Sequence, residues 1–152
     1  MPKIDKENII SRLGTDYPAP FDTPCVNRMT QDVSDTGGLS QFGVKLITLP
    51  PGVWSSQRHH HSAEDEFVYI ISGHPTFIDD AGAQILSPGD MTTHPAGDSN
   101  GHHMKNETDM DVTFIVVGSR QPKIDNCHYP DIDLALPANG TPQRSFQNKA
   151  KC

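Results

Sequence analysis

The sequence has few cysteines and no long apolar run. Cys25, Cys127 and Cys152 are its only cysteines, and they form no CxxC pair. An odd, scattered set argues for free thiols and against a disulfide framework. No apolar stretch approaches the roughly 20 residues that span a bilayer, and the N-terminus lacks the apolar core of a signal peptide. We therefore expect a cytoplasmic protein with no membrane segment.

Basic residues are also scarce. The 12 Lys and Arg are outnumbered by 19 Asp and Glu, which gives a formal net charge of -7. Such a chain offers no broad cationic surface to a phosphate backbone, so we expect no nucleic-acid partner. A Ser-His-Asp order, a phosphate-binding Gly-rich loop and a nicotinamide fingerprint are absent from the sequence as well. The expected partner is a small-molecule ligand or substrate.

Glycine and proline organise the chain. With 13 Pro and 12 Gly in 152 residues, one domain of short strands and many turns is favoured over long helices. We expect an N-terminal arm over residues 1–37, a barrel over 38–136 and a flexible polar tail over 137–152. The arm is predicted to hold a short amphipathic helix at 4–13. An arm of this kind also suits a homodimer, which we expect.

Alternating apolar residues between turn signals predict the strands. The predicted strands cover residues 42–49, 53–61, 66–72, 75–79, 83–86, 91–95, 102–106 and 112–118. The two strands at 75–79 and 83–86 form a hairpin around an Asp-Gly turn. Many short strands of this kind indicate an all-β sandwich or small barrel.

Histidines concentrate in two short windows, as is typical of a metal site. Residues 59–61 and 102–103 hold five of the eight histidines. Because side chains alternate between the two faces of a strand, His59 and His61 share one face and His60 points to the other. Two imidazoles can therefore reach one ion.

A carboxylate follows the first window. Glu66 lies an odd number of residues after His59, which would place it on the wrong face of one continuous strand. The polar stretch 62–65 permits a reversal, which would bring Glu66 beside the histidines on an antiparallel neighbour. Glu66, Val68 and Ile70 would then line one interior face.

The second window supplies a third imidazole. His102 opens a later strand and completes a predicted site of three imidazoles and one carboxylate, formed by His59, His61, Glu66 and His102. Such N/O ligation suits Fe, Mn, Co, Ni, Cu or Zn and disfavours soft-metal or iron-sulfur chemistry, which requires thiolates. The cysteines are distant in sequence. We expect one divalent transition metal ion, Fe, Mn, Ni or Zn.

Other polar residues near these windows have simpler interpretations. His60 and His103 are expected to point away from the site. His94 precedes a proline and is therefore extended, and the pattern leaves open whether it faces the cavity or the solvent. Glu64 and Asp65 are alternatives to Glu66 as the carboxylate, but as turn residues they are expected to be solvated. Three aromatic residues are assigned to core packing: Trp54, Phe67 and Tyr69.

Two stretches of the chain resemble the two motifs of the cupin superfamily. The first motif is matched by His59-x-His61-x4-Glu66-x6-Gly73. The second is matched by Gly89-x5-Pro95-x-Gly97 followed by His102-x3-Asn106. Four residues instead of two separate Gly97 from His102, which leaves His103 as the alternative to His102. The wider sequence is similar to small single-domain bacterial cupins.

The resemblance implies a fold and a set of ligands. It implies a double-stranded β-helix, or jelly-roll barrel, with a metal ion inside its wider mouth. His59, His61, Glu66 and His102 stand at the ligand positions of the motifs. The reaction stays open at this point.

Two classes of function fit such a site. One is a metal-dependent enzyme that acts on a small polar oxygenated substrate, either as a dioxygenase or as an isomerase or lyase. An isomerase or lyase also needs a general base near the metal, and the sequence offers no second unambiguous base. The alternative is a non-catalytic module that binds a sugar or other small metabolite, and a third possibility is a metal that only holds the barrel mouth together.

Overall fold

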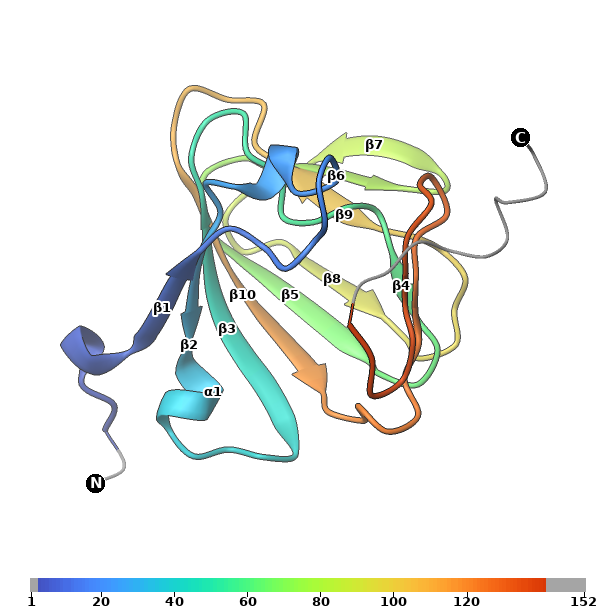
Figure 1. Ribbon diagram of the computed structural model, residues 1–152. Helices are drawn as coiled ribbons and strands as arrows, with labels where there is room; N and C mark the ends of the chain where they lie inside the picture. The colour runs from blue at the N-terminus through green and yellow to red at the C-terminus, as the bar shows by residue number, and fades with distance from the viewer. Residues whose placement is uncertain (1–2, 142–152) are drawn as a thin grey trace.

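Short antiparallel strands make up almost all the regular structure of the computed structural model, which describes residues 3–141 (Figure 1). The helical segments of this range are one turn each: η1 (Lys6–Asn8), η2 (Thr23–Cys25) and α1 (Val33–Thr36). The predicted all-β class is therefore confirmed. The predicted tail at 137–152 lies mostly outside the described residues.

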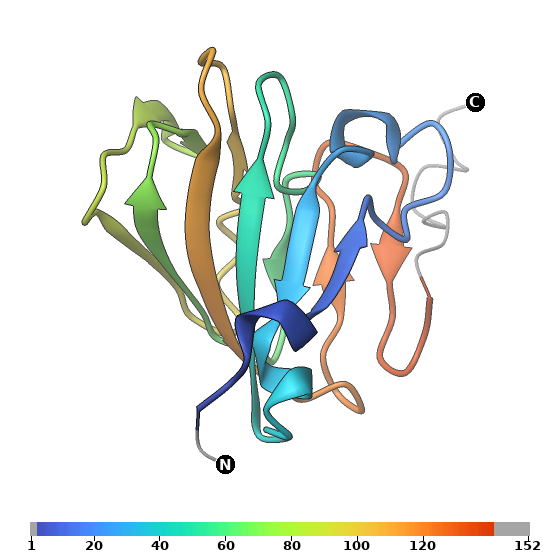
Figure 2. The same ribbon diagram turned by 90° about the vertical axis from the view of Figure 1, so that its left-hand side faces the viewer.

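The largest sheet has six strands in the order β1-β2-β3-β10-β5-β8 (Figure 2). Its strands are β1 (Ile10–Leu13), β2 (Met29–Asp32), β3 (Phe42–Leu49), β10 (Val112–Ser119), β5 (Glu66–Ser72) and β8 (Met91–His94). All neighbouring strands in this sheet are antiparallel. The predicted N-terminal arm thus contributes two strands, β1 and β2, to one side of the sheet.

Two three-stranded sheets complete the barrel opposite the large sheet (Figure 1). One has the order β7-β6-β9, with β6 (Thr76–Asp79), β7 (Gly82–Ile85) and β9 (His103–Lys105). The other has the order β12-β11-β4, with β4 (His60–His61), β11 (Cys127–His128) and β12 (Ala135–Leu136). The interior is therefore enclosed by three sheets whose strands come from distant parts of the chain.

Most of the predicted strands are present, and two predicted elements are wrong. The strands at 42–49 and 66–72 have the predicted bounds, and the hairpin at 75–86 forms as β6 and β7. The helix predicted at 4–13 is instead the short η1 followed by β1. Residues 53–59 of the strand predicted at 53–61 form only isolated bridges, because this segment bends between sheets instead of pairing along its length.

The main core lies between the inner face of the large sheet and the β7-β6-β9 sheet. The strand register aligns one row of side chains across the large sheet: Thr30, Ile47, Phe114 and Ile70. Phe77 and Met104 of the smaller sheet are also buried in this cluster. The alternation in β5 buries Val68 and Ile70 and leaves Tyr69 39% exposed, so the assignment of Tyr69 to the core is wrong.

A smaller core lies around β11. Cys127, Tyr129 and Leu134 are buried there, with Tyr17 and Phe21 of the N-terminal arm packed against them. Cys25 and Cys127 are buried free thiols, as expected, while Cys152 lies outside the described residues. The second core therefore attaches the arm to the barrel.

Within residues 3–141, no helix is long and apolar enough to cross a membrane. The expected homodimer and the expected cytoplasmic location stay predictions.

The turn after β5 requires glycine at position 73. Gly73 has φ +80°, and an added Cβ would lie 2.6 Å from the backbone oxygen of Asp111 and 2.9 Å from the Cα of Val112. Gly52 has nearly the same φ, +79°, but an added Cβ would meet no atom within 4 Å. The two positions therefore separate the cost of a left-handed conformation from the cost of a backbone clash.

We predict that Gly73→Ala destabilises the protein much more than Gly52→Ala. Gly52→Ala should cost about 1–2 kcal/mol, the strain of an L-residue in the left-handed region. Gly73→Ala should exceed that by at least about 1 kcal/mol, because the β5 turn and the start of β10 must move apart. Urea denaturation of the two variants measures the difference, and equal losses would contradict this account of the turn.

Candidate metal centre

The two histidine windows meet through the backbone. His59 and His102 form an isolated antiparallel bridge, in which His59 N donates to His102 O at 3.1 Å and His102 N donates to His59 O at 2.9 Å. Their rings lie 4.9 Å apart between centroids. Arg58, beside His59, holds this junction by donating to the backbone oxygen of Gly101 at 3.2 Å and by pairing with Asp131. Residues far apart in sequence are thus fixed side by side.

Glu66 completes a three-residue cluster with the bridged histidines. One possible ligand atom from each of His59, Glu66 and His102 lies within 4.8 Å of the others. The Nε2 of His102 and the Oε1 of Glu66 are 3.2 Å apart. The burial pattern of β5 turns Glu66 and Val68 to the same interior face, as predicted, although β4 and β5 are in different sheets instead of pairing with each other. Glu66 therefore reaches the histidines across the barrel.

His61 is close to His59 but is not part of that three-residue cluster. Its ring lies 5.1 Å from the ring of His59 between centroids. It belongs to two other potential metal-binding groups, one with His59 and Cys127 and one with Glu64 and Asp125. Cys127 is paired with His61 in the β4–β11 register. A buried thiol therefore lies beside the imidazoles, although the cysteines are distant in sequence.

Hydrogen bonds fix the tautomers of two imidazoles. The Nδ1 of His59 is 2.9 Å from the backbone oxygen of Gln57, which can only accept, so Nδ1 carries the hydrogen. The Nδ1 of His61 is 2.7 Å from the Oδ2 of Asp125. Burial opposes ionisation of Asp125, but the bond to His61 and a bond from the Ala63 backbone leave its pKa lowered, so it also accepts. Both Nε2 atoms keep their lone pairs, as metal-binding histidines require.

His94 stacks directly on the site. Its ring lies 3.4 Å from the ring of His102 between centroids with an interplanar angle of 6°, and Phe77 stacks on it at 5.8 Å. In the β5–β8 register His94 is opposite Glu66. The sequence left open whether His94 faces the cavity or the solvent. Its ring packs against His102 in the interior and does not line the main cavity.

Electrostatics keep the buried imidazoles neutral and the carboxylate charged. Burial lowers the pKa of His59 to about 3 and that of His94 to about 4, with neighbouring histidines adding to the effect. Burial alone would raise the pKa of Glu66, but its bond to His102 and the adjacent His59 lower it to about 2. At neutral pH the site thus presents the neutral imidazole of His59 and the ionised carboxylate of Glu66, the forms that bind a metal.

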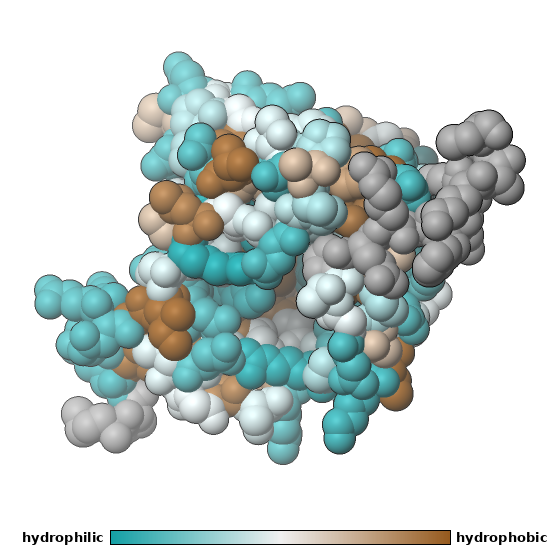
Figure 3. Space-filling view, viewed as in Figure 1, coloured by the Kyte–Doolittle hydropathy of each residue, from teal (hydrophilic) through white to brown (hydrophobic). Residues whose placement is uncertain are grey.

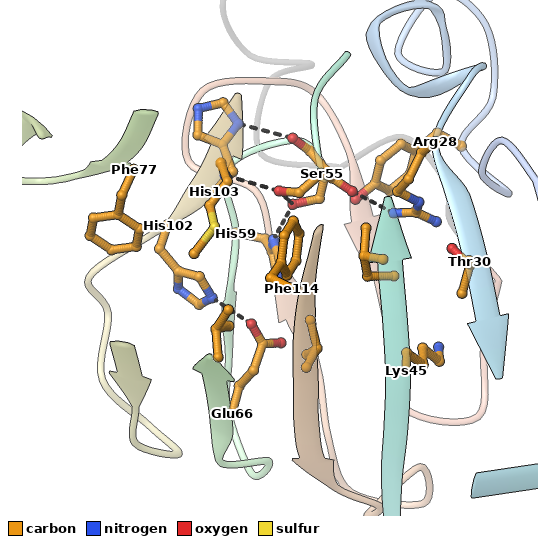
Figure 4. A pocket seen from close by; sticks show the side chains of 16 residues that line it. Arg28, Thr30, Lys45, Ser55, His59, Glu66, Phe77, His102, His103 and Phe114 are labelled. Atoms are coloured by element: carbon orange, nitrogen blue, oxygen red, sulfur yellow. Dashed lines mark hydrogen bonds and ion pairs between the residues drawn. The ribbon is translucent and has the colours of Figure 1, made fainter. Parts of the chain in front are cut away.

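A cavity of about 220 Å3 opens beside these residues (Figure 4). His59, Glu66 and His102 line it together with apolar side chains of β3, β5 and β10. The same face of the molecule is hollowed near its centre, with mostly hydrophilic residues around the hollow (Figure 3). A small polar molecule could therefore reach the cluster from the solvent.

His60 lies outside the cavity, as predicted, whereas His103 and Glu64 differ from their predictions. His60 stacks on His128 at 5.1 Å and does not line the cavity. His103 lines the cavity, but its Nδ1 lies 2.9 Å from the backbone oxygen of Ser56, and its ring packs edge-on against Trp54. Glu64, expected to be solvated, is half-buried and accepts from the backbone of Gln121 at 2.6 Å.

Several residues of the site were not identified from the sequence. Asp125 orients His61 from the loop before β11, and Arg28 and Thr30 line the cavity from β2 and the residue before it. Arg28 and Thr30 fall in the predicted N-terminal arm, which was not expected to form part of the barrel wall. An isolated Asp in a polar loop carries no periodic signal that could have singled it out.

Comparisons with known proteins agree with this fold. A family profile described as the Cupin domain matches residues 45–118. A crystal structure from Silicibacter pomeroyi, described as a sugar phosphate isomerase from a cupin superfamily, superposes with a TM-score of 0.88. Its sequence is 42% identical over 94% of this chain and 92% of that chain. None of the curated proteins compared with the chain matches it significantly.

More distant structures share the same architecture. An Acidithiobacillus ferrooxidans protein, described provisionally as a sugar phosphate isomerase, is 29% identical over 77% of this chain and 74% of that chain, with a TM-score of 0.71. A Thermotoga maritima protein, described as a predicted oxalate decarboxylase, is 17% identical over 78% of this chain and 99% of that chain, with a TM-score of 0.62. The latter likeness concerns the fold alone.

We predict that the metal-free protein loses stability as the pH falls below about 6.5. His59 and His94, with folded pKa values of about 3 and about 4, take up protons in the unfolded chain first, since the ordinary value is 6.5. Between these values, the free energy of unfolding should fall by up to about 1.4 kcal/mol per pH unit for each histidine. Below the ordinary Glu66 value of 4.5, that carboxylate adds to the loss.

Urea denaturation over this pH range measures the slope. His94→Gln should make the slope shallower by about one histidine's share, whatever its effect on absolute stability. His74→Gln is the matched control, because His74 is exposed and outside the site. A free energy of unfolding that stays constant between about pH 6.5 and about pH 4 would contradict the burial of neutral imidazoles.

Proposed function

The chain belongs to the cupin superfamily, and from that premise we propose that it is a metal-dependent isomerase of a small sugar-type substrate, a polyhydroxy aldehyde or ketone. The observation that carries the proposal is the cluster of His59, Glu66 and His102 beside a cavity of about 220 Å3. The 42% identical protein from Silicibacter pomeroyi, described as a sugar phosphate isomerase, supports the choice of reaction.

The residues of the cluster fit a divalent transition metal. Imidazole and carboxylate donors suit Fe, Mn, Ni or Zn. We propose His59, Glu66 and His102 as ligands, with His61 as the fourth, because its ring lies 5.1 Å from that of His59 and its Nδ1, bonded to Asp125, leaves Nε2 for a metal. Asp125 and the Gln57 backbone hold two of the imidazoles in the metal-binding tautomer.

Isomerisation requires removal of a proton from the carbon next to a carbonyl. When bound, a divalent ion supplies Lewis acidity that polarises the carbonyl and makes that proton more acidic. The electron pair of the broken C–H bond then forms the C=C bond of an enediolate, and the π pair of the carbonyl moves onto its oxygen. Return of the proton to the former carbonyl carbon, together with transfer of the hydroxyl proton to the former carbonyl oxygen, gives the isomer. The protein must supply a group that accepts and returns this proton.

Glu66 is the group that we propose for this proton transfer. Among the described residues that line the cavity, it is the only acid. Oε1 lies 3.2 Å from the Nε2 of His102, so Oε1 would be the oxygen offered to the metal and Oε2 would be left for the substrate. Its carboxylate stays ionised because His102 and His59 offset the effect of burial on its pKa. The apolar lining, which includes Val68 and Phe114, limits access of water to the enediolate.

We predict that Asp125→Asn weakens metal binding by about 10-fold to 100-fold, because the amide cannot hold His61 in the same way as a carboxylate. Wild-type protein loaded with metal and then desalted should retain close to one ion per chain by elemental analysis. His60→Gln is the control, since His60 lies outside the cavity. Metal retention unaffected by Asp125→Asn would argue against His61 as a ligand, and no retention by wild type would refute the site.

The reaction itself can be followed by deuterium exchange. Protein loaded in turn with Fe(II), Mn(II), Ni(II) and Zn(II) is incubated in D2O with aldoses and aldose phosphates, and NMR detects deuterium at the carbon next to the carbonyl. With metal at saturation, Glu66→Gln should slow exchange by at least about 100-fold. Glu7→Gln, an exposed carboxylate far from the cavity, should have no effect.

Two results would replace this proposal with another. Sugar binding without deuterium exchange by any metal form would favour a non-catalytic binding module. Oxygen consumption by the Fe(II) form with an oxygenated substrate would favour a dioxygenase.

A further inference from the structure

The side of the cavity opposite His102 and Glu66 carries two cations (Figure 4). Arg28 lies just before β2, and Lys45 lies on β3, the next strand of the sheet. Glu66 is the only acid among the described lining residues. The lining thus carries an excess of positive side chains in a chain whose formal net charge is -7.

The guanidinium of Arg28 has no counter-ion in the part of the chain that the structure describes. It donates to the backbone oxygens of Ser55 and Gly14, at 3.1 Å for the latter, and forms no ion pair within residues 3–141. Its Nε is buried without a hydrogen-bond partner. Burial is the first cause that lowers its pKa, so its surroundings disfavour the charge. A buried cation that contacts only carbonyls is costly unless an anion joins it.

Thr30 places a second unpartnered donor next to Arg28. It is 4% exposed, lines the cavity from β2, and its Oγ1 has no hydrogen-bond partner. Buried hydroxyl groups are nearly always bonded, so an unpartnered one that faces a cavity requires an explanation. Three of the four unpartnered buried atoms in the described chain belong to residues that line this cavity: Arg28, Thr30 and His102.

Lys45 lies at the solvent side of the same region. It is exposed and makes no hydrogen bond or ion pair in the described chain. Asp32 is opposite Lys45 in the β2–β3 register. Burial opposes ionisation of Asp32, but bonds from the Asp35 backbone and Ser34 to its Oδ1, with a smaller effect of the Lys45 charge, leave its pKa lowered, and no hydrogen bond joins it to Lys45 in the described chain. The ammonium group therefore keeps its donors available to a ligand.

We propose that Arg28, Thr30 and Lys45 form a subsite for a phosphate group of the substrate. A guanidinium N–H and a hydroxyl would donate to phosphate oxygens, and the ammonium would add a second charge at the entrance. The inference rests on the proposed function, since it names the second end of that substrate. Arg28 donates to the backbone oxygen of Ser55, and the hydroxyl of the next residue, Ser56, lies 3.3 Å from the Nδ1 of His59, so one small molecule would be held at its phosphate and at its carbonyl.

The test measures binding of inorganic phosphate to protein freed of metal by a chelator. Calorimetry and thermal shift at constant ionic strength should show saturable binding and concentration-dependent stabilisation. Thr30→Val, which removes the hydroxyl but keeps the shape, should weaken binding by about tenfold, as expected for a bond to a charged group. Thr30→Ser should restore it, and Lys45→Gln should weaken it.

Matched controls come from the same chain. Thr48→Val changes a threonine of β3 that does not line the cavity, and Lys123→Gln removes an exposed charge elsewhere. Both should bind phosphate as the wild type does. Acetate is tested beside phosphate, and equal affinity for the two would overturn the assignment to phosphate.

Two further outcomes would refute the subsite. One is a metal-free protein that binds no phosphate, or that binds it only after metal is restored. The other is equal affinity of Thr30→Val and Thr30→Ser. These results are separate from deuterium exchange with unphosphorylated aldoses. Phosphate binding at Thr30 without deuterium exchange in any aldose or aldose phosphate would keep the anion site and refute the isomerase.

Discussion

The bridge between His59 and His102 is the constraint on which the site depends. Two backbone hydrogen bonds, at 3.1 and 2.9 Å, join segments that enter the barrel from different sheets. Arg58 secures the junction through the Gly101 carbonyl and the Asp131 carboxylate, so the imidazoles are placed by the main chain and not by flexible side chains. Glu66 lies on the facing sheet, and its position on the inward face of β5 is enough to bring it to these imidazoles.

Burial gives the two sides of the cavity opposite electrical characters. Around His59 and His94 it disfavours protonation, so the nitrogen donors stay neutral next to one ionised carboxylate. Around Arg28 it surrounds a cation that has no counter-ion among residues 3–141. Ser55 and Ser56 connect the two sides, since Ser55 accepts from Arg28 and the Ser56 hydroxyl lies 3.3 Å from the Nδ1 of His59. A molecule that has a carbonyl oxygen able to bind a metal, and a separate anionic group, matches both sides.

The alternation of apolar residues predicted the barrel strands but did not predict the contacts between sheets. The strands at 42–49 and 66–72 alternate so regularly that their bounds follow from the sequence, and the face of Glu66 follows with them. The helix predicted at 4–13 failed because its apolar residues pair as a strand with β2, a tertiary choice that no local period encodes. Asp125 and Cys127 approach His61 only through the β4–β11 pairing, which joins segments more than 60 residues apart. The sequence therefore indicated candidate donors but not the groups that orient them.

Different segments of the chain supply the two sides of the cavity. The family profile covers residues 45–118, which contain His59, Glu66 and His102. Arg28 and Thr30 lie outside that range, on β2 and the residue before it, while Lys45 is the first residue of the range. The range of the family profile thus holds the proposed metal ligands, while two of the three residues proposed to bind phosphate lie outside it. Substitutions in β2 could therefore change which anionic group the cavity holds without replacing any of the proposed metal ligands.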